Sequence, residues 1–301
     1  MSQRRPHLSA ALATVVAVLA ACSVEPTPTL SPAPSPSTSP TPTLAADLLD
    51  RPWTVLFAGI DLNDRREREG LTPSTDALLL VHVSADGSRV AMVSLPRDTV
   101  DVPLPDGGTW TRKINALYND QGIGALVGAL ETLYELPIDA HVVLDMEDFT
   151  RIVDAVGGIE VAPEEPLRDR IVRLRLKAGP QTIDAATANG YVRSRVDQDY
   201  GRMARQQEVL LAIVERLVHP GADLDVADLA RSLESLETDL PLDELPTLLE
   251  LARRAVDADL ESLVIEPPLI TFEGDRGDGR GYVLEPDIEA IRAEVASLVG
   301  E

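Results

Sequence analysis

Short apolar runs of strand length alternate with longer amphipathic runs of helix length from Trp53 onward. The run Trp53–Ile60 (WTVLFAGI) is rich in β-branched and aromatic residues, which favours a buried strand. Ala77–Val83 and Arg89–Leu95 are predicted to follow as strands, and the Asp-Gly pair between them predicts a hairpin. Because strands and helices are interleaved, we predict the α/β class, with a mixed central β-sheet flanked by helices.

Helices are predicted where apolar residues recur at helical spacing. These segments are Gly124–Leu136, Glu147–Val156, Ala185–Tyr191, Gly201–Val218, Val226–Leu236, Leu242–Val256 and Pro286–Val299. Gly157 and Gly158 predict the end of the second of them. Shorter strands are predicted at His141–Leu144, Ile159–Val161 and Leu263–Glu266, and a turn at Gly274–Gly281. No low-complexity segment interrupts this part of the chain, so we predict one domain over residues 47–301.

The first residues are predicted to form an export signal. Arg4 and Arg5 precede Leu8–Ala21, an uncharged run that is too short to span a bilayer. The run ends in Leu-Ala-Ala-Cys22, which resembles the lipobox of bacterial lipoproteins. We therefore expect residues 1–21 to be removed and Cys22, the only cysteine, to become an acylated N-terminus. The paired arginines also weakly resemble a twin-arginine signal, so the export route stays open.

Residues 22–46 are predicted to be a linker between the lipidated cysteine and the domain. Ser, Thr and Pro dominate this stretch, which holds seven prolines. Such a composition cannot bury apolar surface and favours the extended polyproline II conformation. We therefore expect a stalk that holds the domain on the extracytoplasmic face of a bacterial cell membrane.

Charge narrows the possible partners. The net charge of −23 argues against nucleic acid, or an anionic membrane surface, as the main partner.

Four arginines lie close together in this otherwise acidic chain. Arg193, Arg195, Arg202 and Arg205 all fall within the segment Tyr191–Gln207. If the segment is extended at Arg193 and Arg195, both side chains point to the same face. If it is helical at Arg202 and Arg205, these two lie on the same side of the helix. Converging guanidinium groups suit phosphate and pyrophosphate, and the alternative is ordinary surface ion pairs with carboxylates.

Three other segments carry polar residues at the ends of predicted strands or helices. Asp61 directly follows the first predicted strand, and Asp76 stands at the start of the second. The two are predicted to share a Mg²⁺ ion, and the alternative is that both cap turns. Arg97 and the next residue, Asp98, follow the third strand, where α/β proteins gather ligands; a surface ion pair is the alternative. Lys113-Ile-Asn115 contains an asparagine that could cap a helix or bind a ligand.

Several familiar sites are missing from the sequence. The four histidines are scattered, which argues against zinc. The chain has no Gly-x-Ser-x-Gly nucleophile motif, Walker loop or dinucleotide-binding fingerprint.

The polar segments, taken in order, resemble the LytR–CpsA–Psr family of cell-envelope phosphotransferases. The matching stretches are TDALLL, SLPRDT, KINALY, VDAVGGIEV and YVRSR…DYGRMARQQ. The resemblance is close from Trp53 to Val218 and looser beyond, through Thr238–Leu245. It implies a mixed α/β fold with an apolar tunnel for a polyprenyl chain. It also implies transfer of a phosphoglycan from a polyprenyl pyrophosphate carrier to a peptidoglycan sugar hydroxyl.

The resemblance also implies roles for individual residues. Asp61 and Asp76 match the family's metal and pyrophosphate aspartates. The catalytic set is predicted to be Asp76, Arg97, Arg193 and Arg195, and the substrate-binding set Lys113, Asn115, Arg202, Arg205 and Gln206. Asp98 or Asp199 is a candidate base.

The sequence departs from the family pattern at two places. The family usually carries an arginine two residues before the aspartate of the TD motif, where this chain has Ser74. We expect Arg65, Arg66 or Arg68 of the preceding loop to compensate at least in part; the alternative is that the three belong to a solvated charged loop. In the run before YVRSR, Ala185 replaces a usual glycine. Two alternatives to the transferase therefore stay open, a lipoprotein that binds the lipid or glycan without catalysis and a lipid pyrophosphatase.

Overall fold

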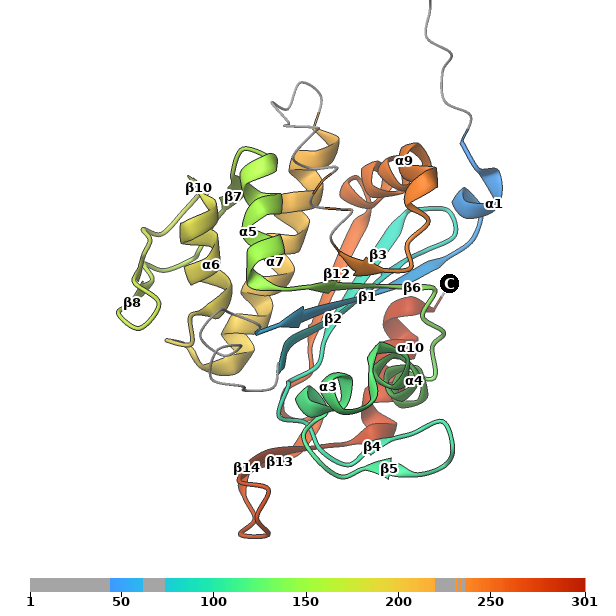
Figure 1. The fold of residues 1–301 in the computed structure, drawn as a ribbon, viewed down its shortest axis with the longest axis vertical. Helices are drawn as coiled ribbons and strands as arrows, with labels where there is room; N and C mark the ends of the chain where they lie inside the picture. The colour runs from blue at the N-terminus through green and yellow to red at the C-terminus, as the bar shows by residue number, and fades with distance from the viewer. Residues whose placement is uncertain (1–43, 62–73, 220–230, 232, 234–235, 301) are drawn as a thin grey trace, which may run out of the picture. The chain divides into compact units, whose positions relative to one another are not determined.

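The computed structural model describes residues 44–61, 74–219, 231, 233 and 236–300 (Figure 1). Cys22, the predicted signal peptide, nearly all of the predicted linker and Arg65, Arg66 and Arg68 lie outside the described residues. So does most of the predicted helix Val226–Leu236. None of the helices in the described part has the length and apolar character needed to cross a membrane.

A six-stranded mixed sheet forms the centre of the domain, with the strand order β11-β6-β1-β2-β3-β12 (Figure 1). Its strands are β1 (Trp53–Ile60), β2 (Thr75–Val83), β3 (Arg89–Ser94), β6 (Ala140–Leu144), β11 (Glu237–Thr238) and β12 (Asp259–Val264). β1, β2 and β3 run antiparallel to one another in turn, whereas β6 is parallel to β1 and β12 is parallel to β3. The predicted hairpin is confirmed, and Asp86 stabilises its turn by accepting from the Ser88 N–H at 2.9 Å.

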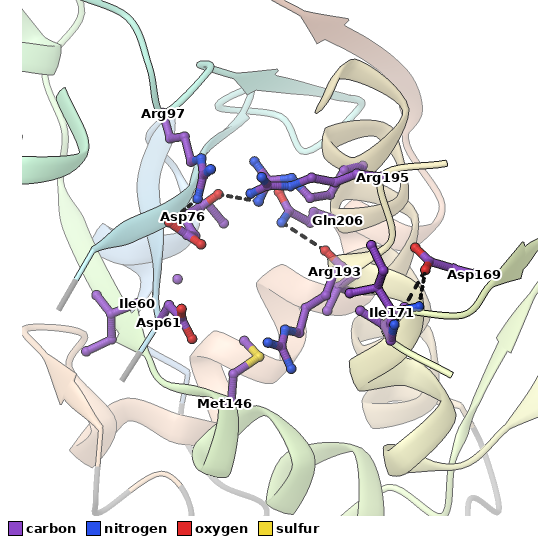
Figure 2. A pocket seen from close by; sticks show the side chains of 15 residues that line it. Ile60, Asp61, Asp76, Arg97, Met146, Asp169, Ile171, Arg193, Arg195 and Gln206 are labelled. Atoms are coloured by element: carbon purple, nitrogen blue, oxygen red, sulfur yellow. Dashed lines mark hydrogen bonds and ion pairs between the residues drawn. The ribbon is translucent and has the colours of Figure 1, made fainter. Parts of the chain in front are cut away.

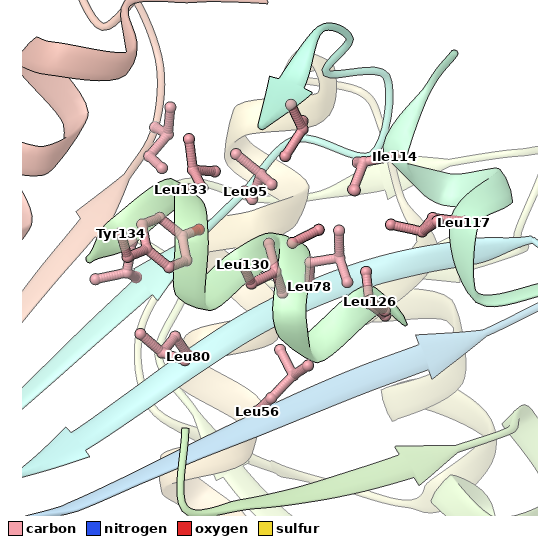
Figure 3. Close-up of a cluster of buried hydrophobic side chains, with 14 of the residues drawn as sticks. Leu56, Leu78, Leu80, Leu95, Ile114, Leu117, Leu126, Leu130, Leu133 and Tyr134 are labelled. Carbon is pink, nitrogen blue, oxygen red and sulfur yellow. The ribbon is translucent and has the colours of Figure 1, made fainter. Parts of the chain in front are cut away.

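Alternation along the strands gives the sheet two apolar faces, each covered by helices (Figure 1). Leu56, Leu78 and Leu80 point to one face, where they pack against α4 (Ile123–Tyr134) and its neighbours (Figure 3). Also on this face are α3 (Leu117–Gln121) and α10 (Ile288–Val299). Leu79 and Met92 point the other way, towards α7 (Gln198–Val218) and the end of α9 (Leu245–Val256). The predicted class of a mixed sheet flanked by helices is therefore confirmed.

A second apolar core lies beside the sheet, between three helices. α5 (Met146–Ala155) and α6 (Ala185–Arg193) pack on α7 around Val153, Tyr191 and Ile213. Two short strands, β7 (Ile159–Val161) and β10 (Gln181–Ile183), close this core. Between them the chain forms a small hairpin of β8 (Arg168–Asp169) and β9 (Leu174–Arg175). This core holds α6 and the start of α7 against the end of the sheet.

The remaining elements are mostly short and were not predicted. They are α1 (Ala46–Leu49), β4 (Val102–Pro103), β5 (Thr109–Trp110), η1 (Ile114–Ala116), β13 (Ile270–Asp275) and β14 (Tyr282–Pro286). The helix predicted over Leu242–Val256 begins as the 3-10 helix η2 (Leu242–Glu244) and continues as α9. The strand predicted at Leu263–Glu266 is displaced, because β12 occupies Asp259–Val264. β12 is an edge strand whose first four residues are exposed, so it lacks the apolar pattern on which the prediction relied.

Gly158 is required where α5 ends and β7 begins. Its φ is +86°, and a Cβ at this position would lie 2.8 Å from the Ile183 carbonyl oxygen. We expect Gly158→Ala to lower the free energy of unfolding by about 2–4 kcal/mol, measured by urea denaturation. Gly124→Ala is the matched control, because its Cβ would meet nothing within 4 Å and alanine favours the helix. Equal stability of the two variants would contradict this reading of Gly158.

Candidate active site

The strands β1, β3, β6 and β12 run in the same direction, so their C-terminal ends lie along one side of the sheet. β2 runs the opposite way and begins on that side. Asp61 directly follows β1, and its N–H donates to the Ser74 carbonyl at 2.8 Å, which brings it beside the start of β2. Asp76 is the second residue of β2, and Arg97 follows β3. A pocket of about 400 Å³ opens at this edge (Figure 2). Seven of the residues predicted for the site line it: Asp61, Asp76, Arg97, Arg193, Arg195, Arg202 and Gln206.

Arg97 is held at the pocket by carboxylates. Its Nη1 donates to Asp76 Oδ1 at 2.7 Å, while its buried Nε lies 3.8 Å from Asp98 Oδ2 and has no hydrogen-bond partner among the residues that the structure describes. Burial alone would lower the pKa of Arg97, but the Asp76 carboxylate raises it above its ordinary value. Arg97 is therefore a fixed cation whose buried Nε–H still lacks an acceptor among the described residues.

Lys113 and Asn115 support this loop and are not among the residues that line the pocket. Lys113 Nζ lies 2.8 Å from Asp98 Oδ1, and the Asn115 backbone N–H donates to the Arg97 carbonyl at 3.2 Å. Both residues hold the turn that presents Arg97. Their direct contact with substrate stays a prediction.

Arg202 joins α7 to the sheet. Its guanidinium forms a two-pronged pair with Asp199, through Nε at 3.0 Å and Nη2 at 2.8 Å. The remaining Nη1 donates to the Asp76 backbone carbonyl at 2.7 Å. Arg202 therefore fixes the position of Asp76. Because its side chain is only 3 % exposed, little of its surface is accessible to a ligand.

Arg193 and Arg195 are the more open cations of the pocket. Figure 2 shows them approaching the cavity from the side opposite Asp61 and Asp76. Among the described residues, the Arg193 side chain has a single hydrogen bond, to Asn189 at 3.3 Å, and Arg195 lies 3.3 Å from Asp199. Burial lowers the pKa of Arg195, and the neighbouring guanidinium groups of Arg97 and Arg202 lower it further. The positive charges of this cluster repel one another, and a bound anion would reduce that repulsion.

Arg205 is separated from the pocket that the other arginines share. Its side chain is 6 % exposed, and it donates to the Tyr191 carbonyl at 3.1 Å and the Ser194 carbonyl at 2.5 Å. It also forms a two-pronged pair with Asp197. The structure thus places Arg205 behind the arginine-bearing loop, and its predicted contact with substrate stays a prediction.

Two backbone features shape the loop between α6 and α7, which carries Arg195. Gln198, at the start of α7, has a φ of +72°, which is rare for a residue with a side chain. Gly201 lies directly under the Asp197 carboxylate, and a Cβ there would come within 2.3 Å of it. The glycine of the DYGR motif therefore makes room for the ion pair between Asp197 and Arg205.

Asp169, Ile171 and Val172 of the β8–β9 hairpin also line the pocket, and sequence reasoning missed them. Asp169 Oδ2 accepts from Ser194 Oγ at 2.8 Å, and its Oδ1 accepts from the Ile171 N–H at 2.8 Å. Burial raises the pKa of Asp169, but these hydrogen bonds outweigh it and hold the pKa below its ordinary value. The alternation of arginine and apolar residues in RDRIVRLR was the available signal.

An apolar cavity of about 100 Å³ adjoins the pocket. The two cavities share walls formed by Gly59, Ala77, Met146, Val192 and Gln206. Deeper in, the apolar cavity is lined by Phe57, Leu79, Phe149 and Leu210, among others. Gln206 stands at the boundary, where its Nε2 donates to the Val192 carbonyl at 3.2 Å. A ligand that fills both cavities needs a phosphate-like end and an apolar end.

Fold and site together define an α/β protein with an arginine-rich pocket at a sheet edge, joined to an apolar cavity. The LytR_cpsA_psr family model matches residues 29–292, and the chain belongs to this family. The resemblance seen in the sequence is therefore confirmed.

Two relatives carry names that refer to the cell wall. The chain is 27% identical to TagV of Bacillus subtilis over 259 residues, named a polyisoprenyl-teichoic acid–peptidoglycan teichoic acid transferase, covering 82% of this chain and 64% of TagV. It is 35% identical over 154 residues to the probable cell wall biosynthesis protein LcpB of Corynebacterium glutamicum, covering 50% of this chain and 36% of LcpB. The chain thus spans less than two thirds of the length of both relatives.

Solved structures share the fold. The crystal structure of B. subtilis TagV superposes with a TM-score of 0.63 at 26% identity, covering 83% of this chain and 98% of that one. The structure titled TagT bound to LIIa-WTA gives a TM-score of 0.65 at 23% identity, over 85% of this chain and 93% of that one. At that identity the second match supports the fold alone.

Proposed function

We propose that this protein transfers a phosphoglycan from a polyprenyl pyrophosphate carrier to a sugar hydroxyl of peptidoglycan. The observation that carries the proposal is the joined pair of cavities, arginine-rich at the mouth and apolar beyond the shared wall. A polyprenyl pyrophosphate has the same two-part character. The assigned name of TagV, which includes a polyisoprenyl-linked donor and a peptidoglycan acceptor, supports the same reading.

In the proposed reaction the acceptor hydroxyl oxygen attacks the phosphorus that bears the glycan. A new P–O bond forms, the bond to the bridging pyrophosphate oxygen breaks, and polyprenyl phosphate leaves with the electron pair. Arg97, Arg193 and Arg195 stabilise the charge that develops on the leaving phosphate, because fixed cations in a partly desolvated pocket need no reorganisation. The hydroxyl proton passes to a carboxylate; Asp98 and Asp199 are the candidates, and Asp199 is already engaged by two arginines.

Asp61 and Asp76 would hold the proposed Mg²⁺. The described residues contain no cluster of three or more His, Cys, Asp or Glu suited to a metal. Two carboxylates fit magnesium nevertheless, because Mg²⁺ commonly takes one or two protein carboxylates and completes its shell with phosphate oxygens and water. Asp76 can offer Oδ2, since Oδ1 accepts from Arg97. When bound, the ion would neutralise charge on the pyrophosphate oxygens.

The test supplies purified protein with a polyprenyl-pyrophosphate-linked glycan, Mg²⁺ and peptidoglycan fragments. We expect the glycan on the peptidoglycan and polyprenyl phosphate in solution. Cleavage that continues without acceptor and leaves no glycan on peptidoglycan would instead identify a lipid pyrophosphatase. Binding of the donor without any cleavage would identify a non-catalytic lipid-binding protein. Chelation by EDTA should stop transfer if the aspartate pair works with magnesium.

We also propose that Cys22 anchors the protein to the extracytoplasmic face of the membrane. Cells fed a fatty-acid probe should label the wild-type chain, and Cys22→Ser should remove the label because the thiol that accepts the lipid is gone. Equal labelling of both chains would rule out acylation at this cysteine.

A further inference from the structure

The β8–β9 hairpin concentrates basic charge in an acidic chain. Between Arg168 and Lys177 lie five basic residues and one acidic residue, although the whole chain has a net charge of −23. The basic residues are Arg168, Arg170, Arg173, Arg175 and Lys177, and all five are exposed. In the described part of the chain, none of the five has an ion pair or a side-chain hydrogen bond. The single acid, Asp169, is buried beneath them.

An apolar tip projects from the middle of this basic segment. The Ile171 side chain is 93% exposed, the highest value among the large apolar residues described as exposed. Such a side chain leaves water only by meeting another apolar phase. Basic residues around an exposed apolar one are typical of segments that bind the interface of an anionic bilayer.

The tip is held in a defined shape beside the pocket mouth. Asp169 Oδ1 accepts from the N–H groups of Ile171 and Val172, at 2.8 and 3.4 Å. Its Oδ2 accepts from Ser194, which directly precedes Arg195 in the chain. Arg173 completes the turn with a φ of +56°. The hairpin is thereby tied to the loop that carries the pocket arginines, and its own Ile171 and Val172 form part of the pocket wall.

We infer that this hairpin docks on the surface of an anionic phospholipid bilayer, with Ile171 in the interface and the arginines against the headgroups. The inference rests on the proposed function in one respect, that a lipid-linked donor must reach the pocket from a membrane. The overall negative charge does not prevent docking, because salt screens charges beyond about 10 Å and the nearest groups dominate. Docking would turn the mouth of the pocket towards the bilayer.

An anionic glycopolymer could pair with the same arginines. Such a chain offers no apolar phase for Ile171, whereas a bilayer accommodates both the arginines and the isoleucine. The exposed isoleucine therefore favours the membrane.

The experiment measures binding to vesicles without donor or acceptor, so its result is independent of catalysis. Every protein sample is the full chain with Cys22→Ser, which removes the acyl anchor. Any contribution of the first residues to vesicle binding is then the same in every sample. Vesicles are phosphatidylcholine alone or an equimolar mixture with phosphatidylglycerol, and bound protein is measured by flotation. The variants are Arg170→Gln with Arg175→Gln, and separately Ile171→Ser. The charge-matched control is Arg112→Gln with Arg253→Gln, two exposed arginines on other elements.

We expect tighter binding to the mixed vesicles than to the neutral ones, and weaker binding as salt rises. Each hairpin arginine removed should reduce affinity on the order of fivefold. Ile171→Ser should weaken binding to the mixed vesicles, and the control pair should bind like the parent chain. Equal binding of parent and hairpin variants would overturn the inference. So would binding of soluble poly(glycerol phosphate), but not of vesicles, through the same arginines.

Discussion

Arg195→Ala should lose most transfer activity, tenfold to several hundredfold, while its melting temperature stays at or above that of the wild type. A charge-assisted contact to a partly desolvated phosphate is worth about 1.5–3 kcal/mol or more, which sets the size of the loss. Stability should not fall, because burial and the neighbouring Arg97 and Arg202 lower the pKa of Arg195, so its charge is unfavourable in the folded state without a ligand. Asp199 keeps its two-pronged pair with Arg202.

One measurement beside turnover and one control variant test this prediction. Inorganic pyrophosphate should raise the melting temperature of the wild type more than that of Arg195→Ala, because only the wild type has the full cation cluster. Arg253→Ala is the control, an exposed arginine on α9 whose pairs are with Glu250 and Asp257. Wild-type turnover in Arg195→Ala, or an unchanged pyrophosphate shift, would remove Arg195 from the site.

Arg205→Ala should behave in the opposite way and destabilise the whole domain. The substitution removes the donors to the carbonyls of Tyr191 and Ser194, together with the two-pronged pair to Asp197. We expect a loss of about 3–5 kcal/mol, since a buried polar network is broken from one side. For a domain of this size the melting temperature should fall by roughly 6–15 °C.

Arg193→Ala is the matched control for Arg205, because within the described part of the chain the Arg193 side chain has one hydrogen bond, to Asn189 at 3.3 Å. It should lose activity without a change in melting temperature. If Arg205 instead binds substrate directly, its alanine variant should melt like the wild type and lose activity alone. Melting curves of both variants, recorded without ligand, separate the two roles.

The parts of the fold that could be predicted are those with a strong local pattern. β1 was predicted to the residue because its apolar run is continuous and ends at a polar loop. β12 was displaced, because an exposed edge strand has no such run. Strands of two residues, such as β8 and β9, are too short to show any period.

The site followed the same logic. Asp61, Asp76 and Arg97 were found because they stand at strand ends, where the sheet brings them together. Arg202 and Arg205 were expected to share a side of their helix, but only the first lines the pocket. Arg205 is bound by the carbonyls of Tyr191 near the end of α6 and of Ser194 directly after it, a tertiary contact that helical spacing cannot reveal. Ile171 was missed because its place depends on the hydrogen bond that its N–H donates to Asp169 Oδ1.

The pairing of β12 with β3 affects the order in which the domain can form during synthesis. β1, β2 and β3 are consecutive and can assemble early, but the register joins Arg89 to Asp259 and Ser94 to Val264. Until the ribosome has delivered the later partner, the outer edge of β3 presents unpaired backbone groups beside a highly apolar strand. Contacts between such distant residues close slowly. The nascent chain therefore passes through an aggregation-sensitive interval, and chaperones that shield strand edges should act on it there.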